Sequence, residues 1–498
     1  MPTLQRSATR TLAEQLAERF ATRIRDRLLA PGTRLPSVRQ CAAQHRLSPS
    51  TVVAAYDKLL AQGLVEARAQ RGFFVRDWAE KRPSAVARKA QSAIDSIAIT
   101  DAAEARRRNA PISAATLMRG MFAGDSARPQ PGMGVLPADW LAGDFMAAAL
   151  RQASRGDGLR DATVAYGDPQ GDPLLRRALS RRLAEQGIAA TPAQIITTVG
   201  ATQALDIVSR TLLKPGDTVL VEEPGWSVEF ARLAALGMRM LPVPRGPHGP
   251  ELDVLARYCE AHAGTRQAPR LFVSVSVLHN PTGHSLTPAS AHQLLQLAQR
   301  HDFYIVEDDT YHHLAPEHAT RLAQLDGLQR TLYVSGFAKI LAPGWRVGFL
   351  AAPPVLVEPL LDTKLLATLT TPTLTERALA HCIDQGQLRR HAEKVRARLE
   401  AARSRSVRLA EQAGCRFAAE PAGLFGWVDT GVDTDQLALR LLDEGWLLAP
   451  GALFYAARQP STLMRINFAA AQHAGFWRVF ERARDALGTS GAPQARFA

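Results

Sequence analysis

A lysine near residue 340 has the type and setting for covalent chemistry with a carbonyl compound. Lys339 follows an apolar run and the small-residue stretch at 335–338. A lysine amine can form an imine with an aldehyde, whereas an arginine guanidinium cannot. Lysines are scarce in this chain, at seven of the 60 basic residues, so a lysine at this position is mildly informative. Taken alone, Lys339 could equally be a surface group.

An acidic motif ends the apolar run at 303–307. Asp308 lies in the sequence Glu-Asp-Asp-Thr-Tyr at 307–311. A carboxylate near the ring nitrogen of an aromatic cofactor keeps that nitrogen protonated, which makes the ring an electron sink. Tyr311, three residues further on, could hydrogen-bond an oxygen on the same ring. The alternative is a turn rich in capping residues.

Two more turns follow apolar runs and offer hydrogen-bond donors. The sequence His-Asn-Pro-Thr-Gly at 279–283 presents Asn280, whose amide could donate to the same ring oxygen, although a simple turn is the alternative. The sequence Val-Gly-Ala-Thr-Gln at 199–203 joins an expected strand to an expected helix. The backbone N–H groups of Ala201 and Thr202, with the Thr202 hydroxyl, would then form a phosphate cradle at a helix N-terminus.

Three further side chains suit an aromatic, anionic ligand. Trp226 follows Pro-Gly and could stack on a ring, although a core position is the simpler interpretation. Arg346 ends the sequence Pro-Gly-Trp-Arg, seven residues after Lys339, and suits bidentate phosphate binding. Arg465 lies inside an apolar run. A buried guanidinium needs an anion, which is either a ligand carboxylate or a structural Asp or Glu.

The order and spacing of these motifs resemble fold-type I pyridoxal-phosphate enzymes of the aminotransferase class I/II family, over roughly residues 112–490. The resemblance implies pyridoxal 5'-phosphate as the cofactor and Lys339 as the lysine that forms the Schiff base. It also implies that Asp308 contacts the pyridine nitrogen, and that Asn280 and Tyr311 contact the ring oxygen.

The same resemblance implies roles for the other positions. Trp226 stacks on the ring, and Arg465 binds the carboxylate of an amino acid. Tyr166, in the sequence Tyr-Gly-Asp-Pro-Gln-Gly, looks like the tyrosine that reaches the phosphate of the partner subunit. The implied phosphate contacts within the chain are Arg346, Ala201 and Thr202.

The chain departs from this family beside the lysine. The family usually has a hydroxyl residue three positions before the lysine, and often a serine one position before it. This chain has Gly336 and Ala338 at those positions, and Ser335 is displaced by one. We include Ser335 among the candidate cofactor-binding residues and expect one phosphate donor to be absent.

The surrounding sequence predicts an α/β domain that positions these residues. Short apolar runs predict buried parallel strands, and amphipathic stretches such as 174–186 and 289–301 predict helices between them. From about residue 375 the pattern predicts a smaller α+β subdomain. The six expected strands are 194–199, 218–222, 271–277, 303–307, 331–334 and 347–351.

The first 78 residues predict three helices and a small hairpin. Apolar residues recur at helical spacing from Leu12 to Leu28, and Pro31-Gly32 ends that helix. A second helix is expected at 37–45. Ser48 is a good N-cap for a third helix at 49–62, followed by Gly63 as its stop and by short strands at 64–68 and 72–76. This order predicts a winged helix-turn-helix.

The charge distribution indicates a polyanion partner for this module. The chain has a net charge of +13, and the first 112 residues carry ten of these charges. DNA is the simplest such partner, although a solvated basic surface on a helical bundle is the alternative. Residues at the start of the third helix and on the wing are placed to contact DNA, and Arg34 and Arg39 can flank the groove. The candidates are Arg34, Arg39, Ser48, Ser50, Thr51, Arg68, Arg71 and Gly72.

The N-terminal segment closely resembles the GntR family of regulators. The resemblance rests on Gly-x-Arg-Leu-Pro-Ser-Val-Arg at 32–39, Leu-Ser-x-Ser-Thr-Val at 47–52 and Gly-Phe-Phe-Val at 72–75. Together, the two halves resemble the MocR subfamily. We therefore expect a DNA-binding domain at 1–78, a linker at 79–111 and an aminotransferase-like domain at 112–498, whose small subdomain covers about 375–498.

This resemblance implies a transcription regulator that senses pyridoxal phosphate, an amino acid or an amine. An amino acid or amine held by Arg465 would displace Lys339 by aldimine exchange, and a head-to-tail homodimer would present two DNA-binding heads. One alternative is a working aminotransferase of the 2-aminoadipate or aromatic type, with an accessory DNA-binding domain. The other is a plain DNA-binding protein whose enzyme-like domain only dimerises.

Composition excludes several other classes of protein. No apolar run approaches the length of a membrane span, and the polar N-terminus lacks the apolar core of a secretory signal. The four cysteines are scattered, which argues against a disulfide framework and against a zinc site. We therefore expect a cytoplasmic protein with no structural metal and no membrane partner.

Overall fold

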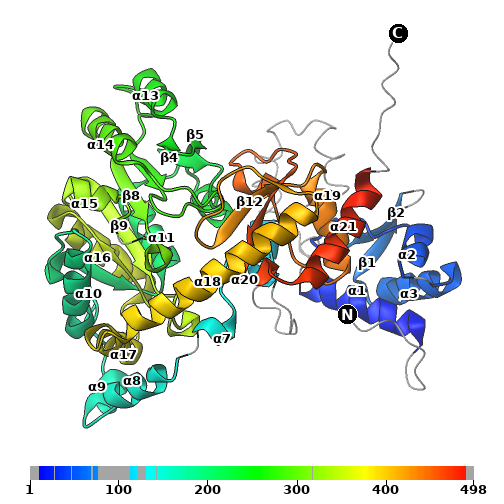
Figure 1. Cartoon of the computed structure of the whole chain (residues 1–498), viewed down its shortest axis with the longest axis horizontal. Coiled ribbons are helices and arrows are strands. Elements are labelled where there is room, and N and C mark those ends of the chain that lie inside the picture. The colour runs from blue at the N-terminus through cyan, green and yellow to red at the C-terminus, as the bar shows by residue number, and fades with distance from the viewer. Residues whose placement is uncertain are drawn as a thin grey trace, which may run out of the picture. The chain divides into compact units, whose positions relative to one another are not determined.

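The computed structural model describes residues 11–26, 28–45, 47–68, 71–76, 113–120, 130–141, 143–316 and 318–488. The chain divides into two compact units (Figure 1). The first comprises Met1–Ala127 with Ala438–Leu447, and the second comprises Arg128–Leu437 with Leu448–Ala498. The linker expected at 79–111 lies outside the described residues.

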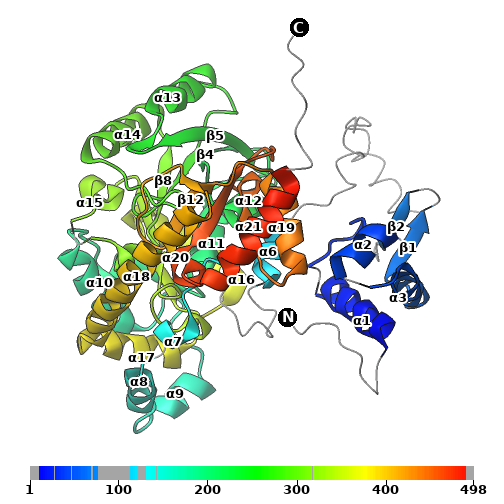
Figure 2. The ribbon, with the colours of Figure 1, turned by 45° about the vertical axis from the view of Figure 1, so that its right-hand side comes forward.

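The N-terminal elements confirm the three helices and the hairpin. Helices α1 (Leu12–Arg25), α2 (Val38–His45) and α3 (Pro49–Ala61) are followed by strands β1 (Val65–Arg68) and β2 (Gly72–Val75), which pair antiparallel (Figure 2). The boundaries agree with the prediction within about three residues. This is the architecture of a winged helix-turn-helix.

Local sequence and a small aromatic core fix this module. The Ser48 hydroxyl accepts from Thr51 N, and Pro49 opens α3, so the start of the helix is capped as expected. Tyr56 on α3 is fully buried, with its ring edge-on to Phe20 of α1 at 5.8 Å. Its hydroxyl donates to Pro36 O at 2.8 Å. This contact anchors α3 to the chain just before α2.

The second unit is built on an eight-stranded sheet of order β3-β10-β9-β8-β7-β4-β5-β6. Strands β4, β5, β7, β8 and β9 pair parallel to one another, and β6 forms an antiparallel hairpin with β5. The strands are β3 (Ile195–Thr198), β4 (Thr218–Glu223), β5 (Arg239–Gly246), β6 (Gly249–Pro250), β7 (Leu271–Ser274), β8 (Tyr304–Asp308), β9 (Thr331–Gly336) and β10 (Gly348–Ala351).

One strand runs against the prediction. All six expected strands form, but β10 pairs antiparallel with both β3 and β9. The connection from β9 to β10 covers only 337–347 and contains a single short 3-10 helix, η5 (Pro343–Trp345). A parallel crossover needs a longer connection, usually a helix packed on the sheet. The chain therefore turns back directly, and this turn carries Lys339 and Arg346.

Helices cover both faces of the sheet, which explains why the strands are apolar throughout (Figure 1). On β4, Val219 and Val221 pack in one core with residues of α11, α12 and α16, while Leu220 packs in the other with residues of α13, α14 and α15. Side chains alternate along a strand, so one strand serves both cores. These helices are α11 (Ala201–Leu212), α12 (Ser227–Ala235), α13 (Leu252–Ala261), α14 (Pro288–His301), α15 (Leu322–Asp326) and α16 (Pro354–Thr368), and α10 (Pro173–Glu185) matches the other predicted helix.

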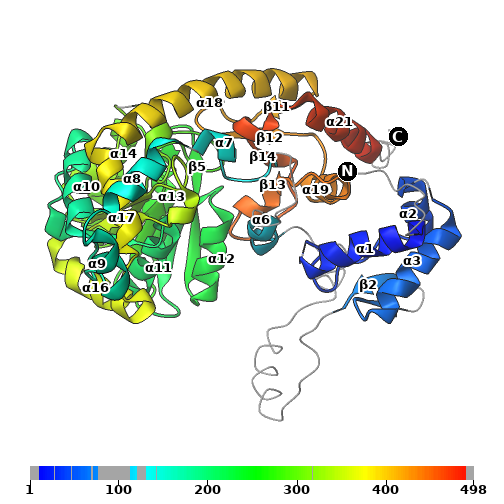
Figure 3. The ribbon, with the colours of Figure 1, turned by 90° about the horizontal axis from the view of Figure 1, so that it is seen from below.

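A smaller α+β part of this unit follows α17 (Thr373–Asp384) and begins with the long helix α18 (Gln387–Gln412) (Figure 3). Its antiparallel sheet has the order β11-β12-β14-β13. Within the described ranges, no helix is both long and apolar enough to cross a membrane. The strands are β11 (Arg416–Phe417), β12 (Phe425–Asp429), β13 (Ala449–Pro450) and β14 (Leu463–Asn467), and the helices that follow are α20 (Phe468–Ala471) and α21 (Ala474–Gly488).

Candidate functional site

Lys339 lies just beyond β9, at the carboxyl end of the parallel sheet. Its amine donates to Gly134 O at 2.6 Å. Burial of the amine and the nearby Arg465 guanidinium lower the pKa of Lys339 to about 8. A neutral amine is the form that attacks an aldehyde, so this environment makes Lys339 a better nucleophile near neutral pH than an exposed lysine.

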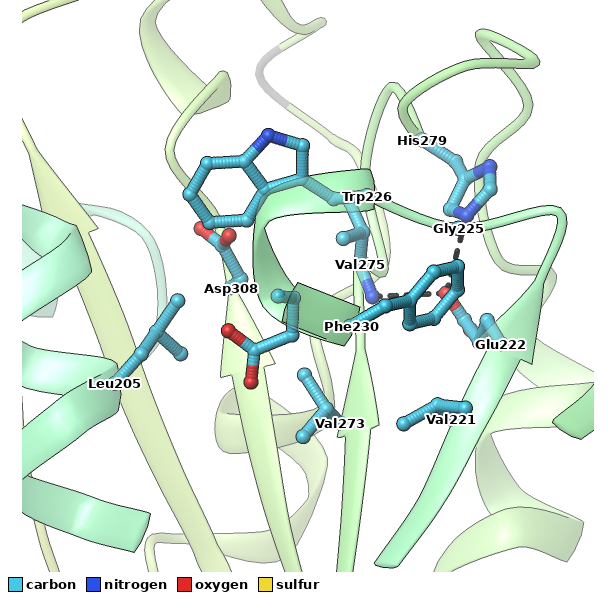
Figure 4. Close-up of a pocket in the computed structure, with 11 residues that line it drawn as sticks. Leu205, Val221, Glu222, Gly225, Trp226, Phe230, Val273, Val275, His279 and Asp308 are labelled. Carbon is cyan, nitrogen blue, oxygen red and sulfur yellow. Dashed lines mark hydrogen bonds and ion pairs between the residues drawn. The ribbon is translucent and has the colours of Figure 1, made fainter. Parts of the chain in front are cut away.

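Asp308 ends the neighbouring strand β8 and faces a small chamber. Its Oδ1 accepts from the Thr310 hydroxyl and from Thr310 N at 3.1 Å. Burial, with a smaller contribution from Glu229, raises the pKa of Asp308 to about 6. Trp226 and Asp308 line the same cavity of about 20 Å³, and Figure 4 shows the indole beside the carboxylate. An aromatic ring could stack on Trp226 with its nitrogen toward Asp308.

Arg465, Asn280 and Tyr311 converge on one wall of the site. Arg465 Nη1 donates to Asn280 Oδ1 at 3.0 Å, and the Asn280 side chain also hydrogen-bonds Tyr311. The guanidinium carbon lies 4.4 Å from the ring centre of Phe425 and 5.2 Å from that of Phe454. Burial lowers the pKa of Arg465 to about 10.

The Arg465 guanidinium has no protein counter-ion among the residues that the structure describes. It forms no ion pair there, and its Nε has no hydrogen-bond partner. A buried cation without an anion is costly. The structural Asp or Glu that the sequence left open is therefore not observed, and a ligand carboxylate would meet the electrostatic need of the site.

The start of α11, where the sequence predicts a phosphate cradle, has no side-chain cap. Gly200, at φ +87°, is its N-cap and supplies no capping side chain, so the first N–H groups of the helix remain available to an anion. Arg346 reaches this turn and donates to Val199 O at 2.9 Å. A Cβ on Gly200 would lie 2.6 Å from Arg346 Nη2, and one on Gly348 would lie 2.7 Å from Ala201 N. Glycine at both positions keeps the cradle open.

These residues fit pyridoxal phosphate. The structure brings a nucleophilic lysine, a buried carboxylate, an aromatic face and an uncapped helix start with an arginine to one end of the sheet. Each matches one part of that cofactor: the aldehyde, the ring nitrogen, the ring face and the phosphate.

Two predicted cofactor residues, Ser335 and Tyr166, do not line the site within the single chain. The Ser335 side chain is fully buried in β9, and its hydroxyl donates to Asp309 O at 2.9 Å. Ser335 therefore has a structural partner inside the fold, and its displacement by one residue puts it on the other side of the strand from a phosphate donor. Tyr166 is 83% exposed in the single chain, so its predicted role at a partner's phosphate stays a prediction.

Sequence reasoning missed a backbone segment that crosses the site. We call residues 131–135 the strap. Its carbonyls accept from Lys339, from Arg465 and from Asn467. Asn467 follows Arg465 by two residues in β14, so the period of a strand puts both side chains on one face. The two-residue spacing of Arg465 and Asn467 could have indicated that Asn467 also faces the site. The Pro-Gly-Met-Gly-Val sequence of the strap has no side chain that would have indicated its role.

At the proposed DNA-binding surface, the α3 hydroxyl groups form a cluster. Ser48 Oγ lies 2.9 Å from Ser50 Oγ and 2.7 Å from Thr51 Oγ1. Ser48 and Ser50 are exposed at the start of the helix, and Thr51 is half-buried. The three predicted hydroxyl residues are therefore together at the end of α3 that enters a DNA groove in such folds.

The predicted arginines lie on α2 and around the hairpin. Arg39 is exposed on α2. Arg34 packs along the wing, since a Cβ on Gly72 would lie 3.4 Å from its Nε. Arg68 on β1 stacks over Phe74 at 4.7 Å, and Arg71 is exposed in the turn. The structure thus groups Arg34, Arg68 and Gly72 at the hairpin.

The comparisons with known proteins define the class. The family model "Aminotransferase class I and II" matches residues 140–482, and the model "Bacterial regulatory proteins, gntR family" matches residues 12–75. The chain therefore belongs to the aminotransferase class I and II family and carries a GntR DNA-binding domain at its N-terminus. This fusion, with the relatives that follow, identifies the MocR subfamily of GntR-type regulators.

Relatives with the same two parts match most of the chain. It is 30% identical over 459 residues to "HTH-type transcriptional regulator TauR" of Rhodobacter capsulatus, covering 88% of each chain. It is 29% identical to "Probable rhizopine catabolism regulatory protein MocR" of Rhizobium meliloti, covering 80% of this chain and 76% of that protein.

Solved enzymes match the second unit. The α-aminoadipate aminotransferase LysN of Thermus thermophilus, complexed with N-(5'-phosphopyridoxyl)-L-leucine, is 25% identical, with a TM-score of 0.67. The match covers 75% of this chain and 95% of LysN. This part of the chain therefore has the aminotransferase fold type I, and that fold family depends on pyridoxal phosphate.

Proposed function

We propose that this protein is a transcription regulator whose aminotransferase-like unit binds pyridoxal phosphate and senses an amino acid or amine. The observation that carries the proposal is the buried Arg465, which has no carboxylate partner among the described residues and shares the strap with the nucleophilic Lys339. A folded protein tolerates such a pair of cations when anionic ligands occupy the site.

The residues of the site have separate tasks in this proposal. Pyridoxal phosphate, when bound, supplies an aldehyde for amines and a ring that withdraws electrons. Lys339 would hold it covalently, and Asp308 would accept a hydrogen bond from the ring nitrogen. Asn280 and Tyr311 orient the ring oxygen. Arg465 would bind the carboxylate of an incoming amino acid. The amine of that amino acid would compete with Lys339 for the aldehyde carbon of the cofactor.

The N-terminal unit would bind double-stranded DNA. The GntR domain implies DNA binding, and the exposed hydroxyl residues of α3 with Arg39 and the hairpin arginines support a groove-and-backbone mode of contact. DNA as the partner also agrees with action in the cytoplasm. A ligand that binds two states of the regulator with different affinity would shift its DNA-binding equilibrium.

The second unit presents an apolar surface suited to a homodimer. Leu366 is 92% exposed, Val164 74% and Tyr166 83%. The segment that carries Val164 and Tyr166 lies close to the chain that follows α16. A Cβ on Gly167 would lie 2.5 Å from the hydroxyl of Thr373, a few residues after the end of α16. A head-to-tail dimer would cover this surface and bring each Tyr166 to the partner's phosphate.

Mixing the purified protein with pyridoxal phosphate tests the cofactor half. A visible absorbance band should appear, and Lys339→Ala should abolish it because this variant removes the buried amine that lies near Asp308. Lys214→Ala removes an exposed lysine and should leave the band unchanged. A native protein that remains colourless contradicts the proposal.

Electrophoretic shifts on duplex DNA test the other half. Arg39→Ala should weaken binding across sequences, as expected for a backbone contact. Arg25→Ala removes the same charge from α1, where the side chain pairs with Glu18 at 2.9 Å, and should have a smaller effect. Equal losses in both variants would indicate only a general charge effect.

A working transaminase is the second candidate, because Lys339, Asp308, Asn280 and Arg465 are all present and converge. The chain is also 30% identical to a protein named "2-aminoadipate transaminase" from Thermus thermophilus, over 62% of its length. Turnover with a panel of amino acids and a 2-oxo acid separates the candidates. Sustained cycling at ordinary enzyme rates would rule out a purely regulatory role.

A further inference from the structure

All five carbonyls of the strap accept hydrogen bonds from the site. Asn467 N donates to Pro131 O at 2.8 Å, and Asn467 Nδ2 donates to Met133 O at 2.9 Å and to Val135 O at 2.6 Å. The other two carbonyls accept from the site cations: Gly132 O from Arg465 Nη2 and Gly134 O from Lys339, each at 2.6 Å. The strap is thus fastened across the two groups that hold the ligands.

Gly134 is the point of the strap that faces the Arg465 guanidinium. A Cβ on Gly134 would lie 3.8 Å from Nη1 and 3.8 Å from Nη2. A point equally far from both terminal nitrogens lies on the plane that bisects the guanidinium fork. A carboxylate that binds both terminal nitrogens has its carbon on the same plane. Its two oxygens lie at hydrogen-bond distance from the nitrogens, and its carbon lies one C–O bond further out. A methyl group on Gly134 would lie on that plane, beside both nitrogens that a ligand carboxylate would contact, and would crowd the carboxylate.

The protein alone would accept that methyl group. The backbone of Gly134 is outside the left-handed region, since it is absent from the positive-φ glycines of the described chain. The nearest protein atom to its Cβ would be Phe425 Cζ at 3.6 Å, an ordinary van der Waals contact. Packing and backbone conformation therefore do not require glycine at 134, whereas access of a ligand to Arg465 does.

We infer that Gly134 determines specificity for ligands with a carboxylate, and that Asn467 is the positioning residue that holds Gly134 at Arg465. The inference rests on the proposed function, because it concerns the ligand of the same site. Asn467 fixes the strap from both sides of Gly134 through Met133 O and Val135 O. In the part of the chain that the structure describes, the hydrogen bonds of the Asn467 side chain go to the strap and to Ala469 N.

Pairs of probes that differ only in a carboxylate test Gly134. We would titrate L-alanine against ethylamine and L-phenylalanine against 2-phenylethylamine, using the absorbance change of the protein loaded with pyridoxal phosphate. In Gly134→Ala the affinity for both amino acids should fall about ten- to a hundredfold, the value of a charge-assisted bidentate contact, and the affinity for the amines should stay within about twofold. Gly475→Ala, on α21, is the matched control and should change neither affinity.

Two results would overturn the inference. One is a Gly134→Ala variant that binds amino acids as tightly as the native protein, and the other is an equal loss for amines and amino acids. Both are judged on variants that form the same absorbance band as the native protein. A native protein that gives no band, or a band that no probe changes, instead contradicts the proposed function.

A double-mutant cycle tests Asn467. If Asn467 acts by holding the strap, the tenfold or greater penalty of Gly134→Ala should shrink to threefold or less in an Asn467→Ala background, because the released strap can carry the methyl group away from Arg465. A purely structural role of Asn467 predicts the same penalty in both backgrounds, and that outcome would overturn the positioning role. Thermal unfolding of each variant checks that the fold is retained.

Discussion

At the scale of single residues, the site is defined by charges that burial makes unfavourable. Arg465 and Lys339 both have lowered pKa values, and Asp308 has a raised one, each with burial as the largest cause. A stable core would avoid such groups or pair them. Together these groups lower the stability of the ligand-free fold, which is typical of a site that binds charged ligands.

Replacing the buried arginine should therefore separate stability from binding. Arg465→Met removes an uncompensated cation, so the free energy of unfolding of the ligand-free protein should rise by about 1–3 kcal/mol. The same variant should lose the increase in melting temperature that an amino acid confers on the native protein. Thermal unfolding with and without L-alanine measures both effects. A lower stability of the ligand-free variant would show that the hydrogen bonds of Arg465 outweigh its charge.

The lowered pKa of Lys339 predicts a pH dependence for cofactor capture. The neutral amine is the reactive form, so the capture rate should rise with pH through a midpoint at about 8 and level off above it, once the amine is fully deprotonated. Arg465→Gln removes a positive neighbour, which should move the midpoint to higher pH. Stopped-flow absorbance from pH 6 to 10 measures the profile. A midpoint near that of a free lysine would contradict the burial of the amine.

The same pKa shift also affects stability. The folded-state pKa of Lys339 lies below its unfolded value, so between the two values the unfolded chain binds more protons. The contribution of Lys339 to stability therefore increases as pH rises from about 8 toward the unfolded pKa. This effect on stability does not require the cofactor. Burial of the amine causes it, as burial also causes the reactivity of Lys339.

At the scale of elements, the ends of strands position the chemistry. Asp308 ends β8, Lys339 follows β9 and the cradle follows β3. The carboxyl ends of these parallel-running strands meet at one edge of the sheet, where ligands bind in open α/β folds. The antiparallel β10 lies between β9 and β3, and its close approach to the start of α11 depends on Gly348.

Gly348→Ala should damage the cradle without touching a ligand. A Cβ at 348 would lie 2.5 Å from Gly200 C and 2.7 Å from Ala201 N. Both atoms are backbone, so the start of α11 and β10 must move apart, which disturbs the cradle. The affinity for pyridoxal phosphate should fall at least about tenfold, as for other losses of a charge-assisted contact. Equilibrium titration by absorbance measures it, with Gly475→Ala as the control, and an unchanged affinity would place the phosphate elsewhere.

The sequence predicts most of this arrangement, because strand periodicity and capping residues are local signals. Ser48, Pro49 and Gly63 predicted the start and end of α3, and the apolar runs predicted all six strands. The predicted direction of β10 was wrong because the apolar content of a strand does not determine its direction. The short connection from β9 to β10 does. Ser335 and the strap show the same limit, since the partners of a side chain or carbonyl depend on tertiary packing.

At the scale of the whole molecule, a homodimer would let two DNA-binding units act together. Two DNA-binding units on one assembly bind two half-sites with a combined affinity that neither reaches alone. The apolar side chains at the end of α16 are the best candidates for the contact, because a soluble monomer gains nothing from exposing them.

Leu366→Asp should break that dimer while leaving each chain folded. The Leu366 side chain is 92% exposed, so a charge there costs little in the single chain but is desolvated in an interface. We expect a monomer in sedimentation analysis, with native melting of the winged helix and at least about tenfold weaker binding to duplex DNA. Leu325→Asp, on α15 with 51% exposure, is the matched control and should stay dimeric. If Leu366→Asp remains a dimer that binds DNA normally, the subunits meet through another surface, and the predicted reach of Tyr166 to a partner's phosphate loses its support.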